Sequence, residues 1–275
     1  MRRVYLLAHP AGHSLSPAMH NAAFKHLSMS ARYEALDVSP EDLPDAVAAL
    51  RASEVWGANV TIPHKLNVLP LVDRLSAAAQ AIGAVNTVVN RSGELFGDNT
   101  DAAGFLRGLE SADTELQGKK VVMLGAGGAA RAVLYALLSA GAQVYLHNRT
   151  REKAHVLSEA FSSLGPSTVL TDEALGAVTP EADGLVNTTS VGMERGGTDP
   201  DVSPLKLRDL PRRGFVCDLI YRPAQTRLLR DAAAKGVMVQ NGLPMLVYQG
   251  AEAFKLWTGQ DAPTEVMFSA VHRFD

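Results

Sequence analysis

One stretch of about 30 residues places the tightest constraint on the fold. The segment KVVMLGAGGAARAVLYALLSAGAQVYLHNRT begins at Lys120 and combines an apolar strand, a glycine-rich turn, a helical pattern and a second strand. This order is typical of one βαβ unit, in which a helix connects two parallel strands. We therefore predict a parallel sheet covered by helices in the second half of the chain.

The glycine-rich turn GAGGAA, residues 125 to 130, fits the fingerprint of a dinucleotide site. Gly125 permits a tight turn, Gly127 permits close approach of the backbone to a pyrophosphate, and the small Ala130 lets helix and strand pack closely. The same backbone also contains Ala126, Gly128 and Ala129. Because the turn follows a strand and opens a helix, whose N-terminus favours an anion, the pattern favours a cofactor site over a plain glycine turn.

The residues after the second strand indicate which cofactor is bound. An NAD site has an acidic residue there, about 20 residues past the glycines, whereas this chain has HNRT. Arg149 can pair with a 2′-phosphate, and Asn148 and Thr150 can donate hydrogen bonds to it. Lys153, four residues past Arg149, adds positive charge. NADP is therefore the predicted cofactor, and a solvated basic turn is the structural alternative.

The first half of the chain also alternates strand-like runs with helical patterns. The runs VYLLA, ARYEALDV and ANVTI predict strands, and this alternation favours a parallel α/β architecture. Helices are expected to begin at Ser16-Pro17 and Ser39-Pro40, with the serine as N-cap. A helical stretch from Lys65 to Gly83, two strands around the turn NRSG, and a helix capped near Asn99 or Thr100 follow. The polar stretch SADTELQGKK suggests a domain boundary, and the loop at 193–214 is a candidate mobile flap.

Composition excludes several classes of protein. The formal net charge of −3 provides no basic field for nucleic acid or an anionic membrane, and no apolar stretch approaches the length of about 18 residues that spans a bilayer. The short apolar run near the N-terminus favours a first strand over a signal peptide, so we expect a cytoplasmic protein. The single cysteine, Cys217, excludes an internal disulfide and is expected to be buried. His9, His13 and His20 lack a matching ligand pattern, so no metal site is predicted.

Candidate chemical groups gather in the first half. Ser14 and Ser16 stand where a helix begins, a place that suits an anion, although plain capping explains Ser16 equally well. Lys65 in GANVTIPHK and Asp101 in NTDAAGF are a plausible pair for moving a proton onto or off an oxygen. The alternatives are a solvated lysine and an acid that stabilises a helix dipole. Amides that could read hydroxyl groups in a polar pocket are Asn59, Asn86, Asn99 and Gln249.

Several of these motifs occur in the order of a known family, and the chain resembles shikimate dehydrogenase, the NADP-dependent enzyme of aromatic amino acid biosynthesis. The resemblance extends over essentially all 275 residues. It rests on HSLSPAMHN, NVTIPHK, GAVNT and GDNTDAAGF in the first part, then on GAGGAARA, NRT with Lys153, NTTSVGM, DLIYRPAQTRLL and GLPMLVYQGAEAF.

The resemblance implies an α/β fold of two domains with a cleft between them that opens and closes. Residues 1–104 and 243–275 would form the substrate domain, and residues 105–242 a Rossmann-type NADP-binding domain. Ser14 and Ser16 would bind the substrate carboxylate, and Lys65 and Asp101 would be the catalytic pair. The groups around the ring hydroxyls would be Thr61, Asn86, Tyr221 and Gln249, with Lys65 and Asp101. Leu219 and Gly242 would line the nicotinamide.

The implied reaction is the reversible, NADPH-dependent reduction of 3-dehydroshikimate to shikimate. A broad quinate and shikimate dehydrogenase is the nearest alternative. A different NADP enzyme, such as a relative of glutamyl-tRNA reductase or methylenetetrahydrofolate dehydrogenase, would not need HSLSP or NTD. A non-catalytic NADP-sensing protein would not be expected to keep Lys65 and Asp101. Whether the chain forms a homodimer stays open.

Overall fold

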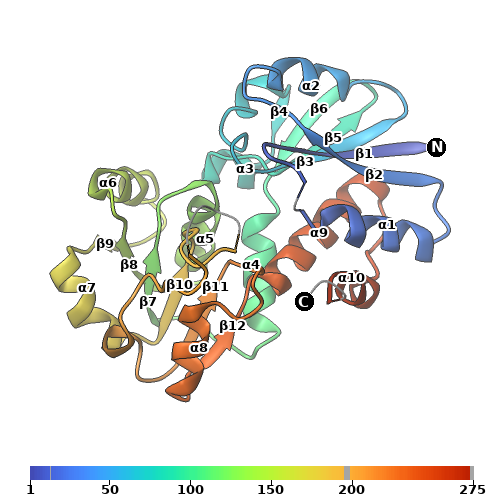
Figure 1. Ribbon diagram of the computed structural model, residues 1–275. Helices are drawn as coiled ribbons and strands as arrows, with labels where there is room; N and C mark the ends of the chain where they lie inside the picture. The colour runs from blue at the N-terminus through green and yellow to red at the C-terminus, as the bar shows by residue number, and fades with distance from the viewer. Residues whose placement is uncertain (13, 195–198, 273–275) are drawn as a thin grey trace. The chain divides into compact units, whose positions relative to one another are not determined.

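The computed structural model describes residues 1–12, 14–194 and 199–272 (Figure 1). The chain divides into two compact units, which we describe separately. The first comprises Met1–Gly104 together with the described residues from Leu246 onward, and the second comprises Phe105–Met245. Both boundaries fall inside helices, namely α4 (Asp101–Glu110) and α9 (Leu243–Thr258).

The first unit is built on a mixed six-stranded sheet. Its order is β2 (Ala31–Asp37), β1 (Arg2–Ala8), β3 (Val55–Val60), β5 (Thr87–Arg91), β6 (Glu94–Asp98) and β4 (Arg74–Leu75). Strand β1 pairs in parallel with β2 and β3, as the alternating pattern predicted. Strand β5 then runs antiparallel to both β3 and β6, which confirms the predicted hairpin around NRSG.

Helices in the first unit are α1 (Ser16–His26), α2 (Leu43–Ala49), α3 (Ala77–Ile82) and α10 (Thr264–Val271). The predicted start at Ser39-Pro40 is wrong, because the Ser39 hydroxyl donates to the Asp42 carboxylate at 2.7 Å and closes a turn before α2.

The predicted continuous helix from Lys65 to Gly83 is also wrong. Asp73 exchanges hydrogen bonds with the backbone of Leu95, so the chain forms β4 beside β6 before α3 begins. Helix α10 was not predicted.

The second unit contains a six-stranded sheet in which every pair is parallel. Its order is β12 (Met238–Gln240), β11 (Phe215–Asp218), β10 (Gly184–Asn187), β7 (Lys120–Leu124), β8 (Gln143–His147) and β9 (Ser167–Val169). The helices are α5 (Gly128–Ser139), α6 (Arg151–Ala160), α7 (Asp172–Val178) and α8 (Arg227–Ala234). The strand order reverses between β7 and β10, and ligands of such sheets bind beyond the carboxyl ends of the strands at that point. The predicted parallel sheet of a Rossmann-type domain is confirmed, whereas α7 was not predicted.

Several expectations concern what the chain lacks. Within the described ranges, no helix is both long and apolar enough to cross a membrane. Nor does any group of three or more potential ligand side chains in that part of the chain suit a metal ion. Cys217 is 1% exposed, which confirms the buried thiol. His13 and residues 195–198 of the candidate flap lie outside the described residues, and the mobility of that loop stays a prediction.

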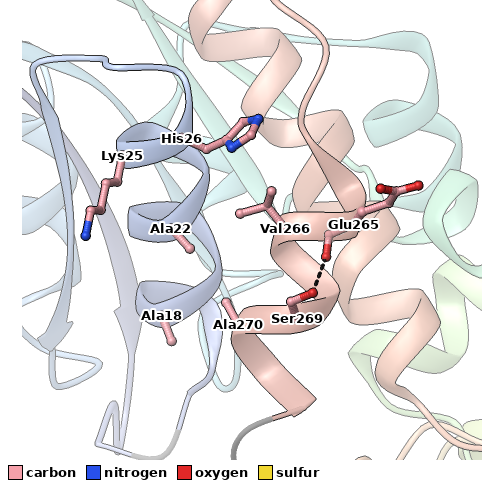
Figure 2. A pocket seen from close by; sticks show the side chains of 8 residues that line it. All are labelled: Ala18, Ala22, Lys25, His26, Glu265, Val266, Ser269 and Ala270. Atoms are coloured by element: carbon pink, nitrogen blue, oxygen red, sulfur yellow. Dashed lines mark hydrogen bonds between the residues drawn. The ribbon is translucent and has the colours of Figure 1, made fainter.

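A surface groove runs between α1 and α10 in the first unit (Figure 2). Its lining residues are Ala18, Ala22, Lys25, His26, Glu265, Val266, Ser269 and Ala270. The Ser269 hydroxyl donates to the carbonyl of Glu265, within α10. None of the predicted site residues lines this groove, so the candidate chemistry lies elsewhere in the unit.

Candidate active site

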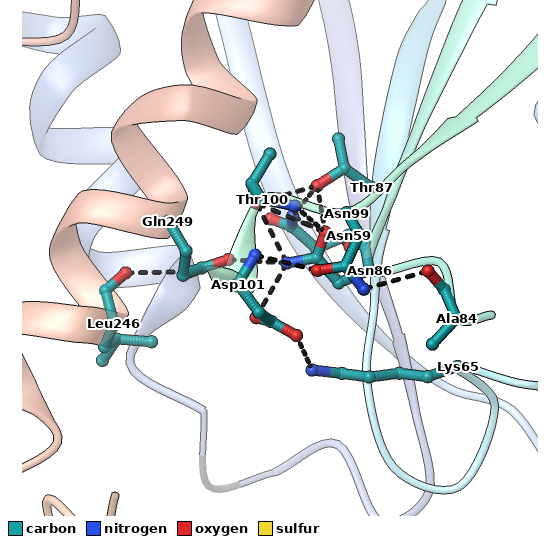
Figure 3. Close-up of polar contacts among 10 residues, drawn as sticks. All are labelled: Asn59, Lys65, Ala84, Asn86, Thr87, Asn99, Thr100, Asp101, Leu246 and Gln249. Carbon is teal, nitrogen blue, oxygen red and sulfur yellow. Dashed lines mark hydrogen bonds and ion pairs between the residues drawn. The ribbon is translucent and has the colours of Figure 1, made fainter. Parts of the chain in front are cut away.

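The predicted proton-transfer pair is formed in the first unit (Figure 3). Lys65 lies in the loop after β3, and Asp101 is the first residue of α4, as its place after NT predicted. Lys65 Nζ is 2.5 Å from Asp101 Oδ2, and the two side chains are only 13% and 6% exposed. This geometry excludes the alternative of a solvated lysine. The role of the pair in catalysis stays a prediction.

Hydrogen bonds to distant parts of the chain hold the loop that carries Lys65. The backbone N–H of Thr61 donates to the carbonyl of Leu7, and the N–H of His64 donates back to the carbonyl of Thr61. The buried His64 ring donates through Nε2 to the carbonyl of Val38 at 2.8 Å, just past the end of β2. The loop is therefore attached to the carboxyl end of β1 through Thr61 and to the residue after β2 through His64.

Asn86 joins the acid to the rest of the polar cluster. Its side-chain Nδ2 donates to Asp101 Oδ1 at 2.9 Å, so the two carboxylate oxygens are divided between Asn86 and Lys65. Asn86 also contacts Gln249 Oε1 at 3.3 Å. Gln249 in turn donates from Nε2 to the carbonyl of Leu246 within α9. The structure thus brings together four of the predicted site residues: Lys65, Asn86, Asp101 and Gln249.

A second set of buried side chains supports this cluster. Thr100 donates its N–H to Asn86 Oδ1 at 2.8 Å, and the Thr87 hydroxyl donates to the same oxygen at 3.0 Å. Asn99 accepts the N–H of Asp101 and donates to the carbonyl of Ala84. The remaining amide, Asn59, donates to the carbonyl of Asn86 and to Thr87 Oγ1. Asn59 and Asn99 were predicted to read substrate hydroxyls, yet in this structure they bind protein groups.

The two predicted anion-binding serines lie at the N-terminus of α1. The Ser14 hydroxyl accepts the backbone N–H of Ser16 at 3.2 Å. Ser16 is the first helical residue rather than the N-cap, which is Leu15. The Ser16 side chain is buried, and burial raises the pKa of the nearby Tyr33. Capping by Ser16 is therefore wrong, and its hydroxyl is directed toward the polar interior.

The glycine-rich turn has the features that a pyrophosphate requires. Gly125 follows β7 with a φ of +108°, and a Cβ there would overlap the Thr188 hydroxyl. At Gly127, the N-cap of α5, a Cβ would have no described atom within 4 Å, so packing does not require this glycine. Its bare backbone instead leaves the start of α5 accessible to an anion. Ala126, Gly128 and Ala129 are partly buried in the same turn, and Ala130 is fully buried.

The predicted phosphate-binding residues follow the neighbouring strand. Leu124 of β7 pairs with His147 of β8, so the loop after β8 and the glycine turn start at the same edge of the sheet. Asn148 donates to the carbonyl of Thr150, and α6 begins at the next residue. The side chains of Arg149, Thr150 and Lys153 are exposed to solvent at this edge. These residues fit a 2′-phosphate, because both basic groups are accessible.

The predicted nicotinamide-lining residues meet within the second unit. A Cβ on Gly242 would overlap the carbonyl group of Leu219, and the Gly242 N–H donates to the carbonyl of Ile220. Asp218, just before this segment, accepts hydrogen bonds from Asn187, Ile220 and Thr226. Tyr221 follows two residues after Leu219, and its part in substrate binding stays a prediction.

Sequence reasoning missed Thr87, Thr100 and Tyr33 as members of the site. Each of the two threonines directly follows a predicted amide, in VNT and DNT, and that repetition is the signal that could have drawn attention to them. Tyr33 occupies β2, where an aromatic residue is an ordinary strand former, so its sequence context gives no signal.

Three protein-family models match most of the chain. Residues 6–88 match the shikimate dehydrogenase substrate binding domain. Residues 109–193 match the model described as shikimate / quinate 5-dehydrogenase. Residues 242–271 match the shikimate 5′-dehydrogenase C-terminal domain.

Individual relatives are similar to this chain over nearly its full length. An NADP(+) shikimate dehydrogenase of Moorella thermoacetica is 47% identical over 270 residues, covering 96% of this chain and 90% of the relative. One from Bacillus mycoides is 43% identical over 262 residues, with 94% of each chain covered. The crystal structure of the Thermus thermophilus shikimate 5-dehydrogenase, in complex with NADP(H) and shikimate, aligns with a TM-score of 0.91 at 46% identity, covering 99% of both chains.

Proposed function

The chain belongs to the shikimate dehydrogenase family, and we propose that it catalyses the reversible NADPH-dependent reduction of 3-dehydroshikimate to shikimate. It is then an oxidoreductase of the shikimate pathway that acts on a CH–OH group. The observation that carries the proposal is the buried ion pair of Lys65 and Asp101, 2.5 Å apart. A ketone that accepts a hydride must also gain a proton on oxygen, and this pair is the candidate proton donor.

Lys65 performs the proton transfer in the proposed reaction. NADPH, when bound, would supply the hydride that reduces the carbonyl carbon. Lys65 Nζ gives a proton to the carbonyl oxygen, which becomes the hydroxyl of the product. In the reverse direction the lysine removes that proton. Asp101 accepts a hydrogen bond from Nζ throughout and holds the amine toward the reacting oxygen.

The remaining first-unit residues bind and orient the substrate. Ser14 and Ser16 are proposed to bind the carboxylate, because their hydroxyls lie at the N-terminus of α1, where the helix dipole favours an anion. Asn86 and Gln249, which already share a hydrogen bond, are proposed to bind ring hydroxyls. Thr61 and Tyr221 would complete that set. Buried amides of this kind reject an analogue that lacks the hydroxyl, since they would lose their partners.

The second unit is proposed to bind the NADP molecule. The N-terminus of α5, with the backbone of residues 125–129, would hold the pyrophosphate. Asn148, Arg149, Thr150 and Lys153 would bind the 2′-phosphate, since a guanidinium matches phosphate geometry with paired hydrogen bonds. Leu219 and Gly242 would line the nicotinamide. An acid at position 149 would instead repel the phosphate.

The direct test is to follow NADPH absorbance with 3-dehydroshikimate, and the reverse reaction with shikimate and NADP. We expect turnover with both substrates and a strong preference for NADP over NAD. Absence of turnover in a folded, NADP-binding protein would overturn the enzymatic proposal and leave the NADP-sensing alternative.

A second candidate, a broad quinate and shikimate dehydrogenase, is favoured by the matching family model, whose description includes quinate. The same assay with quinate discriminates the two. Oxidation of quinate at a rate comparable to that of shikimate would favour the broad enzyme.

The cytoplasmic location would be tested by cell fractionation. The open question of a homodimer would be tested by sedimentation of the purified protein.

A further inference from the structure

Thr87 is a completely buried threonine in the centre of the first sheet, and its hydroxyl forms no hydrogen bond with Lys65 or Asp101. It begins β5 and pairs with Asn59 on β3 and Asp98 on β6. Its hydroxyl donates to Asn86 Oδ1 at 3.0 Å and accepts from Asn59 Nδ2 at 3.2 Å (Figure 3). Thr87 therefore lies between two amides of the polar cluster.

The hydroxyl of Thr87 has two acceptors within reach, Asn86 Oδ1 at 3.0 Å and Thr100 Oγ1 at 3.4 Å, and the shorter contact is the one to Asn86. The Tyr33 hydroxyl donates to Asn59 Oδ1 at 2.8 Å, which fixes the Asn59 carbonyl toward Tyr33 and turns its NH2 toward Thr87. Thr87 Oγ1 accepts from that NH2, so its own proton remains for Asn86 Oδ1. The hydrogen bond from Tyr33 thus sets the direction of the bond from Asn59 to Thr87, which in turn leaves the Thr87 proton for Asn86.

This proton and the Thr100 N–H together determine which way the Asn86 amide faces. Asn86 Oδ1 accepts from the Thr87 hydroxyl and from the Thr100 N–H, so Nδ2 is left facing Asp101 Oδ1 at 2.9 Å. A reversed amide would set its carbonyl oxygen against the carboxylate of Asp101. Two acceptors would then meet in a buried site, which is unfavourable because neither can donate.

We propose that Thr87 is a positioning residue for the reaction: its hydroxyl holds the Asn86 amide so that the NH2 group orients Asp101 toward Lys65. This proposal rests on the proposed function. The Thr100 N–H also favours the observed orientation, so loss of the Thr87 hydroxyl weakens this arrangement without abolishing it.

The test compares Thr87→Val, Thr87→Ser and a matched control, Thr179→Val. Valine keeps the volume and removes the hydroxyl, whereas serine keeps the hydroxyl. Thr179 is also fully buried, and its hydroxyl donates to the carbonyl of Leu175 in the second unit, away from the proposed site residues. We expect Thr87→Val to lower kcat about 10-fold, the scale of one hydrogen bond near a charged group. Thr87→Ser should stay within about 3-fold of wild type, and Thr179→Val should leave kcat unchanged.

A cycle with Asn86→Ala separates positioning from a general loss of stability. If Thr87 acts through Asn86, Thr87→Val should lower kcat less than about 2-fold in the Asn86→Ala background. Equal effects of Thr87→Val in both backgrounds, or no recovery with serine, would overturn the proposal. An inactive wild type would overturn the proposed function instead. An active wild type with an unaffected Thr87→Val variant would overturn the positioning role alone.

Discussion

Lys65 and Asp101 are 36 positions apart in the chain, yet Nζ and Oδ2 lie 2.5 Å apart. The two residues belong to different elements: Lys65 lies in the loop after β3, and Asp101 is the first residue of α4. A surface pair of this kind would contribute little, because water screens it. This pair is buried and receives a further donor from Asn86, an arrangement that is common at functional sites.

The first prediction concerns Lys65. Lys65→Ala removes the proposed proton donor and should lower kcat by about 100-fold or more, the scale of general acid–base catalysis. The KM for the substrate should change little, because the proposed carboxylate partners and the other proposed hydroxyl partners remain. Steady-state kinetics with NADPH checks this. The control is Lys119→Ala, since Lys119 is exposed in the second unit. Near-normal turnover of Lys65→Ala would reject the role.

The second prediction concerns the exposed Arg149. Arg149→Ala removes the proposed guanidinium partner of the 2′-phosphate, so the KM for NADPH should rise about 10- to 100-fold. The KM for NADH, which lacks that phosphate, should stay within about 3-fold of wild type. Arg208→Ala, at another exposed arginine of the second unit, serves as the control and should change neither value. A parallel loss of both cofactors would indicate that Arg149 does not discriminate between them.

The third prediction concerns His20, a fully buried residue of α1. Its ring stacks on Tyr33 with a centroid separation of 4.6 Å, and neither ring nitrogen has a hydrogen-bond partner among the described residues. Burial lowers the pKa of His20 from 6.5 to about 3. Between about pH 3 and pH 6.5, His20 is protonated in the unfolded chain but neutral in the folded chain. The free energy of unfolding should therefore fall as the pH drops below 6.5, by about 2 kcal/mol at pH 5 from this residue alone.

The measurement for His20 is urea unfolding at pH 7 and pH 5. His20→Phe keeps an aromatic ring and removes the titration, so its stability should fall less between the two pH values, by about 2 kcal/mol. His155→Phe is the matched control, because His155 is exposed on α6 and its replacement should leave the pH difference unchanged. The same pH difference in wild type and His20→Phe would show that His20 is charged, or accessible, in the folded protein.

The predictable parts of the fold are those determined by local pattern. The strand, glycine turn and helix around Gly125 follow from the periodicity and from glycine conformations that other residues avoid. The segment after Lys65 was mispredicted, because the backbone of Asp73 pairs with Leu95 across the sheet. No local pattern near Asp73 reveals that partner. Tertiary pairing thus overrode a helical preference.

The candidate site shows the same limit. Lys65 and Asp101 were each identifiable as chemical groups, but their pairing rested largely on family resemblance. Thr87 was not identifiable, since threonine in a strand is normally an ordinary β-former. Its role depends on its chain neighbour Asn86 and on Asn59, which meets it only because β3 and β5 pair in register. Which way an amide faces is decided by such contacts and not by sequence spacing.

The last prediction concerns Gly104, on α4 three residues after Asp101. A Cβ at Gly104 would lie 2.5 Å from the backbone nitrogen of Gln249 and 2.8 Å from its Cα, too close for either helix to tolerate without moving. Gly104→Ala should therefore cost about 1–3 kcal/mol of stability, more than the ~1 kcal/mol that alanine adds to a helix. Because Gln249 must shift, kcat/KM should fall as well.

The matched control for Gly104 is Gly176→Ala in α7. The nearest atom to a Cβ at Gly176 is Asp209 Oδ1 at 3.7 Å, an ordinary contact, so only the helix preference should act. Gly176→Ala should raise the free energy of unfolding by about 0.5–1 kcal/mol and leave kcat/KM unchanged. Thermal unfolding and steady-state kinetics of both variants provide the check. If Gly104→Ala were as stable and active as Gly176→Ala, the close approach of α4 to Gln249 would not be required for the site.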